Sequence, residues 1–176
     1  FFAEAGIATR FQAVGTDITD RRHYEEDLRK LSLAVEQSPE SIAITDVDAR
    51  IEYVNDAFVN TTGYSREEVI GKNPRVLHSG NTPAGTYESM WASLSQGQPW
   101  KGEFHNKRKD GSLYPEWLSV SAVRDDGGTI TNYVAIFTDL SDRVAAEQAV
   151  RASEQRYRTM FEEAPAGVWI IGADDR

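Results

Sequence analysis

Two side chains in the sequence have types and positions that suit the binding of a small molecule. Asn106 lies in a β-rich run, residues 100–109, that is expected to line the interior of a sheet. A carboxamide buried there without a partner costs on the order of 1–3 kcal/mol, so it needs a ligand, a water or a structural hydrogen bond. Trp91 lies on an amphipathic segment, where an indole either packs in the core or forms a flat apolar wall for a ligand. Both alternatives stay open for each residue.

The other reactive residue types favour neither catalysis nor metal binding. The sequence has no cysteine, which excludes disulfides, thiolate metal sites and cysteine-based redox sensing. The three histidines lack the spacing of metal ligands: His23, His78 and His105. There is no Gly-rich phosphate loop, nucleophile elbow, kinase motif or cyclase motif. We therefore expect no enzyme activity in this segment.

Composition limits the size of the core and the class of partner. The 176 residues, of which 40% are hydrophobic, suffice for one complete domain with additional segments. A net charge of -9 disfavours nucleic acid, because phosphates would be repelled. No stretch approaches the length of an apolar membrane span, and the N-terminus lacks the pattern of a signal peptide. We expect a cytoplasmic segment without direct membrane contact, which is compatible with a membrane anchor elsewhere in a longer parent.

The pattern of apolar residues predicts an α+β fold. Asn55, Ser65 and Thr82 are expected to cap helices, with Glu68 completing a capping box. The predicted helices span residues 55–62, 65–71 and 82–97. The predicted strands span residues 41–46, 50–55, 100–109, 113–124 and 129–138. The order indicates a five-stranded antiparallel sheet with helices on one face, flanked by N- and C-terminal helices.

A long internal repeat indicates tandem domains. Residues 6–21 match residues 128–143, and residues 34–50 match residues 160–176. The predicted organisation is therefore a last strand of a preceding domain at 1–19, a linker helix at 20–37, a complete domain at 38–141, a linker helix at 142–163 and a first strand of a following domain at 164–176. The two incomplete copies leave open strand edges near residues 11–16 and 168–171, which we expect to pair with each other.

The linker helices are candidates for dimer contacts and for signal relay. Four apolar residues recur at spacings of four and three, which is typical of a coiled-coil seam: Tyr24, Leu28, Leu31 and Val35. The alternative is an amphipathic helix packed on its own domain. The second linker is longer by four residues, a stutter that shifts the register of such a seam. The segment TDLSDR at 138–143 resembles TDITDR at 16–21, which favours a coupling role for Thr138, Asp139 and Asp142, although aspartate also caps helices.

Several ordered motifs resemble the PAS domain family with its C-terminal PAC motif. They are NDAF at 55–58, TGYSREE at 62–68, GKNP at 71–74, RKDG at 108–111 and TDLSDR at 138–143. The resemblance implies a sensor of small ligands, redox state or light. It also implies dimerisation, neighbouring PAS domains, and a histidine kinase or cyclic-di-GMP enzyme as the output of the parent protein.

Within this family, the run at 73–83 and its surroundings look most like flavin-binding redox sensors. The resemblance implies FAD as cofactor and a cofactor-binding set of Asn106, Trp91, Asn73, Arg75 and His78. The light-sensing branch has its reactive cysteine where this chain has Pro74, which excludes adduct photochemistry. His78 and Thr138 stand where glutamines contact the flavin, and Glu116 stands near a second flavin-binding asparagine. The alternative function is a ligand-free PAS module for dimerisation and relay.

Overall fold

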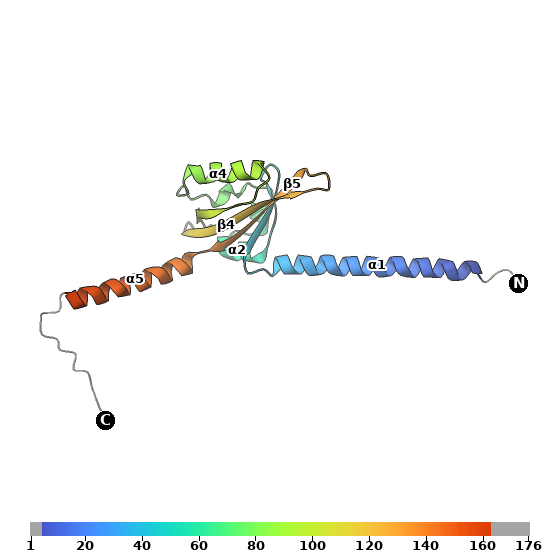
Figure 1. Cartoon of the computed structure of the whole chain (residues 1–176), viewed down its shortest axis with the longest axis horizontal. Helices are drawn as coiled ribbons and strands as arrows, with labels where there is room; N and C mark the ends of the chain where they lie inside the picture. Colours follow the sequence, from blue (N-terminus) through green and yellow to red (C-terminus); the bar gives the residue numbers. More distant parts are fainter. Residues whose placement is uncertain (1–4, 163–176) are drawn as a thin grey trace, which may run out of the picture.

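A five-stranded antiparallel sheet with helices on one face forms the centre of the computed structural model (Figure 1). The structure describes the backbone of residues 5–162 and the side chains of residues 21–162. The strands are β1 (Ser41–Asp46), β2 (Ile51–Val54), β3 (Trp100–Lys107), β4 (Leu113–Arg124) and β5 (Ile130–Asp139). Their spatial order is β2-β1-β5-β4-β3, so the first and last strands are neighbours. The predicted fold class is confirmed.

Short helices connect β2 to β3, namely α2 (Asp56–Thr62), α3 (Arg66–Val69), the 3-10 helix η1 (Pro74–Leu77) and α4 (Ala84–Ser95). Two of these, α2 and α3, begin directly after their predicted caps. Asn55 caps α2, because its side-chain oxygen accepts a hydrogen bond from the Phe58 amide at 3.0 Å. Gly63 ends this helix with a φ of 76°, a conformation that favours glycine. Ser65 and Glu68 form the predicted capping box of α3.

Thr82 does not cap α4 as predicted. The helix begins at Ala84, after Pro83. The Thr82 hydroxyl instead accepts a hydrogen bond from the His105 amide at 2.9 Å and donates one to the His105 carbonyl at 3.2 Å. Thr82 is buried, so its hydroxyl requires partners of this kind. These bonds hold the start of α4 against β3.

Side chains from both layers fill the space between the sheet and the helices. We call the sheet face toward the helices the inner face. On β4, buried residues alternate with more exposed ones because successive side chains point to opposite faces. The core comprises Ala43, Ile51, Val54, Phe58, Val69, Leu77, Leu94, Trp100, Phe104, Tyr114, Leu118, Val120 and Phe137.

The first helix, α1 (Ala5–Glu36), extends beyond the predicted linker at 20–37. It includes residues 11–16, which were predicted to form the last strand of a preceding domain at 1–19. That strand prediction is wrong for this structure. A strand needs a neighbouring strand to bond its amide and carbonyl groups, whereas a helix bonds them internally. The predicted partner strand within 164–176 lies outside the described residues.

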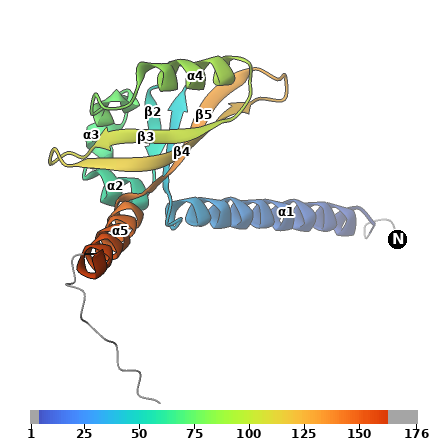
Figure 2. The same cartoon turned by 60° about the vertical axis from the view of Figure 1, so that its left-hand side comes forward.

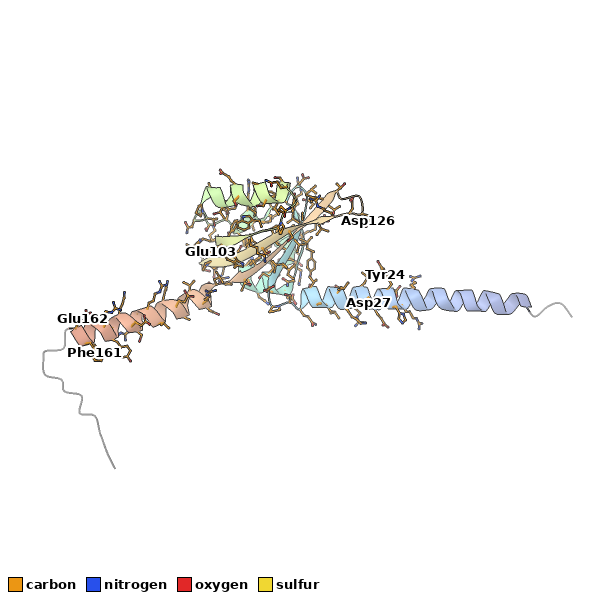
Figure 3. All side chains as sticks on the ribbon, in the orientation of Figure 1. Tyr24, Asp27, Glu103, Asp126, Phe161 and Glu162 are labelled. Atoms are coloured by element: carbon orange, nitrogen blue, oxygen red, sulfur yellow. The ribbon has the colours of Figure 1, made fainter. Side chains whose placement is uncertain are left out.

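Two long helices extend away from the sheet domain and expose apolar side chains. On α1, Tyr24 is 68% exposed, Leu28 50% and Leu31 65%. On α5 (Ser141–Glu162), Val150, Tyr157, Met160 and Phe161 are also exposed. Figure 3 shows Tyr24 and Phe161 on the parts of α1 and α5 that extend beyond the sheet domain. At these positions neither helix packs on its own domain. In the part of the chain with described coordinates, no helix is both long and apolar enough to cross a membrane.

The end of α1 is fastened to the domain by polar contacts. The Glu36 carboxylate accepts hydrogen bonds from the Tyr53 hydroxyl and the Arg66 guanidinium. The Asn55 side-chain amide donates to the carbonyls of Val35 at 3.1 Å and Glu40 at 2.9 Å. Figure 2 shows α2 next to the end of α1 and the start of α5, with α4 at the opposite end of the domain. These contacts therefore fix the position at which α1 joins the sheet domain.

We predict that Asn55→Ala destabilises the domain by roughly 2–4 kcal/mol, because it removes the α2 cap and leaves buried backbone groups without partners. Asn55 is fully buried and its side-chain oxygen also accepts from the Ile42 amide at 2.9 Å. Urea denaturation measures the change. Asn60→Ala, at an exposed position of α2, is the control and should change stability little. Equal unfolding midpoints for the two variants would contradict the prediction.

Candidate functional site

A buried polar pair lies on the inner face where β3 and β4 are paired. Asn106 of β3 is 7% exposed and Glu116 of β4 is 2% exposed. The antiparallel register places Asn106 opposite Tyr114 and Phe104 opposite Glu116. The Asn106 amide donates a hydrogen bond to Glu116 Oε1 at 2.9 Å. Asn106 is thus paired with the carboxyl group of Glu116, which lies two residues after Tyr114, the cross-strand neighbour of Asn106.

Two polar atoms of this cluster lack a hydrogen-bond partner among the described residues. They are the Tyr114 hydroxyl and Glu116 Oε2. Burial raises the pKa of Glu116 to about 7, against the opposing effects of the Tyr114 and Asn106 side chains, which both favour the ionised form. Burial, followed by the negative charge of Glu116, also raises the pKa of Tyr114. Because unpaired buried polar atoms are uncommon, this cluster is the strongest candidate for a functional site in the interior.

Arg108 connects the polar cluster to the start of α5. Its guanidinium lies 4.2 Å from the centroid of the Tyr114 ring and pairs with the Asp139 carboxylate at the end of β5. Asp139 Oδ1 in turn accepts a hydrogen bond from the Ser141 amide at 2.8 Å, at the N-terminus of α5. Partial burial disfavours ionisation of Asp139, but the hydrogen bonds from Ser141 and Arg108 outweigh it and lower its pKa. Arg108 also donates to the Thr61 carbonyl at the end of α2.

Of the other predicted cofactor-binding residues, only His78 adjoins this cluster, and it does so through its backbone. Trp91 is 41% exposed, and its ring meets Tyr133 edge-on with centroids 5.9 Å apart. His78 is exposed, and its backbone forms an isolated bridge with Asn106. Asn73 caps η1 by accepting from the Arg75 amide at 3.0 Å, and the Arg75 side chain is exposed. Of the predicted set, the structure brings only the His78 backbone next to Asn106.

Of the predicted relay residues, Asp139 is the one with contacts to both the domain and α5. Thr138 lies on the exposed face of β5, opposite Trp117. Asp142 is exposed in the first turn of α5, where a negative charge suits the helix dipole. The structure therefore places Asp139 in the hydrogen-bond network of Arg108, and it places Thr138 and Asp142 at the surface of the protein.

Sequence reasoning missed Tyr114 and Arg108 as members of the site and did not include Glu116 in it. One signal was present in β4. There, Glu116 falls on the same side of the strand as the apolar residues Leu118 and Val120. A carboxylate at an inward position of a strand marks a buried polar site. The role of Arg108 depends on a contact between distant segments, which the sequence pattern does not indicate.

Two open pockets among the described residues lie elsewhere, along α2. One is lined by the end of α1 and the start of α2, including Glu36 and Asp56. The other is lined by the end of α2 and the turn after β3, including Gly63 and Arg108. Asn106 lines neither pocket. Tyr114, which lies opposite Asn106 on β4, belongs to the packed core.

Comparisons with known proteins agree with this architecture. Residues 39–142 match the PAS domain family. The nitrogen fixation regulatory protein of Klebsiella oxytoca is 37% identical over 142 residues, which are 81% of this chain and 29% of that protein. The chain thus spans less than a third of that relative.

Solved structures of light-oxygen-voltage (LOV) domains have the same fold. One, from a study of LOV mechanism with a flavin analogue, is 27% identical, with a TM-score of 0.60 over 72% of this chain and 96% of that chain. The LOV domain of a blue-light activated histidine kinase from Erythrobacter litoralis EL346 is 29% identical, with a TM-score of 0.56 over 59% of this chain and 98% of that chain. The chain therefore belongs to the PAS domain family, and its matched segment is a sensory domain of the kind found in signalling proteins.

Proposed function

We propose that this chain is a flavin-binding sensory module, with FAD as the cofactor, within a longer histidine kinase or cyclic-di-GMP enzyme. Its input is the redox state of the flavin or a small ligand, and α5 carries the output. The observation that supports the proposal most is the buried cluster of Asn106, Glu116 and Tyr114, in which two polar atoms lack a protein partner. A ligand with a polar edge would provide those partners.

The chemistry of the cluster fits the polar edge of a flavin. A carboxamide offers a donor and an acceptor side by side, which matches alternating carbonyl and N–H groups. The Tyr114 hydroxyl and a protonated Glu116 add further donors to the same face. When bound, a flavin supplies reversible redox chemistry, while these residues hold and orient its polar edge. A related LOV domain was studied with a flavin analogue, which supports the choice of ligand class.

Binding requires the helical layer to move away from the sheet. Leu77 of η1, Leu94 of α4 and Phe104 of β3 are packed in the core that a ring system would enter. The elements that would move carry four of the predicted cofactor-binding residues, namely Asn73, Arg75 and His78 at η1 and Trp91 on α4. An outward shift of this layer would let these side chains contact the ligand.

The filled core favours a second candidate function, a ligand-free module for dimerisation and relay. Side chains already fill the space between the sheet and the helices, so the core of the domain is packed without a ligand. The exposed apolar side chains of α1 provide a surface for a homodimer. Neighbouring PAS domains and the output domain of the same chain are the further partners proposed for either function.

We predict that the purified protein retains FAD after incubation and shows the visible absorption band of oxidised flavin. Asn106→Ala should weaken retention about tenfold, because it removes a buried hydrogen-bonding group worth about 1.4 kcal/mol. Asn81→Ala, at an exposed position before α4, is the control. Absence of flavin from the unmodified protein would overturn the flavin proposal and leave the ligand-free function. Unchanged retention in Asn106→Ala would remove only Asn106 from the site.

We also predict a homodimer through α1. Leu31→Glu should raise the dimer dissociation constant roughly 100-fold, since burial of two leucines, one from each copy, is worth about 3 kcal/mol or more. Leu33→Glu is a matched control, because Leu33 is 45% exposed on the same helix but outside the seam. Sedimentation equilibrium measures both constants. A monomer at all concentrations, or equal effects of the two substitutions, would contradict the predicted seam.

A further inference from the structure

Glu116 is a carboxyl group in surroundings that disfavour its charge. It is 2% exposed and shares the inner face with apolar core residues. One oxygen accepts the Asn106 hydrogen bond, and the other has no partner among the described residues. An ionised carboxylate can only accept hydrogen bonds, whereas a protonated carboxyl carries a donor on its second oxygen. Burial among apolar side chains favours the neutral form more strongly than the Tyr114 and Asn106 side chains favour the ionised form, and a proton is a ligand that needs no cavity.

We propose that Glu116 is a proton-binding site in the interior of the domain, and that its proton is coupled to the first turn of α5 through Tyr114 and Arg108. The inference concerns the chain without a ligand and is independent of the proposed flavin.

Titratable groups on the neighbouring elements interact with Glu116. Asp139 on β5 raises the pKa of Glu116 and Arg108 lowers it, but burial is the largest cause and brings the value to about 7. Tyr114 lies on the same strand, and Tyr87 approaches from α4, where the charge of Glu116 adds to the effect of burial in raising the pKa of Tyr87. When Glu116 ionises, Arg108 therefore has two carboxylates nearby, those of Glu116 and Asp139.

The link to α5 follows from the contacts of Arg108. The guanidinium is held between the Tyr114 ring and the Asp139 carboxylate, with Ser141 Oγ at 3.5 Å. When Glu116 is neutral, Asp139 is the carboxylate that Arg108 contacts directly. When Glu116 ionises, its charge attracts the same guanidinium and competes with Asp139. Since Asp139 also accepts a hydrogen bond from the amide of Ser141, the first residue of α5, the competition acts on the first turn of that helix.

The first test measures the proton directly. We expect the side-chain carboxyl ¹³C resonance of Glu116 in the unmodified protein to titrate near pH 7. Between the ordinary value of 4.5 and about 7, the folded chain holds one more proton than the unfolded chain, so stability falls as the pH rises. The ratio of the unfolding equilibrium constants of the unmodified protein and Glu116→Gln should therefore increase about tenfold per pH unit in this range.

Glu88→Gln, on the exposed side of α4, is the matched control and should leave the pH dependence of stability unchanged. The carboxyl resonance is measured on the unmodified protein, so the test holds even where the Glu116→Gln variant fails to fold. A midpoint at an ordinary glutamate value would overturn the proton site.

The second test measures the coupling. We expect the backbone amide resonances of residues 140–143 to shift with the same midpoint as Glu116, and to lose that shift in Glu116→Gln but not in Glu88→Gln. Titration of Glu116 near pH 7 with unshifted amides at the start of α5 would overturn the coupling. Because both measurements use protein without flavin, their outcome is separate from the retention of FAD.

Discussion

β5 is hydrogen-bonded on both sides, and this constraint determines where the flanking helices leave the domain. It pairs with β1 from Asn132 to Phe137, and with β4 from Ile130 to Asp139. A strand bonded along both edges cannot shift along one neighbour without breaking bonds to the other. Since α5 begins two residues after β5 ends, the direction of α5 depends on how firmly Asp139 is held. The contacts of Asp139 with Arg108 and Ser141 therefore lie at the one short connection between sheet and exit helix.

The inner face combines a well-packed core with one local conflict. Most of its side chains are apolar, whereas Asn106, Glu116 and the Tyr114 hydroxyl place three polar groups where water is excluded. Local conflicts of this kind are expected at functional sites, because stability alone would favour apolar residues there. The same conflict supports both the flavin proposal and the proton proposal, since each provides a partner for the unpaired atoms.

Most of the fold was predictable from the sequence because strands and helix caps depend on local patterns. The alternation on β4 and the caps at Asn55 and Ser65 needed only neighbouring residues. Thr82 was mispredicted because its hydroxyl bonds to His105, which is distant in sequence. The segment at 11–16 matched a strand in sequence, but strand formation depends on a partner strand, and the segment is helical here. Likewise the pairing of Asn106 with Glu116 depends on the strand register, which the sequence does not specify.

The two long helices are connected to each other by a short route that avoids the inner face. Glu36 at the end of α1 contacts Arg66, which donates to Asp56 at the start of α2. At the other end of α2, the Thr61 carbonyl accepts from Arg108, the residue that pairs with Asp139 before α5.

A chain of contacts is not in itself evidence of coupling, because coupling requires an element with two states. Glu116 supplies such an element next to this route, since its protonated and ionised forms interact differently with Arg108. Arg108 is therefore the residue that joins the contacts of α2 to Asp139 and that also interacts with the charge of Glu116.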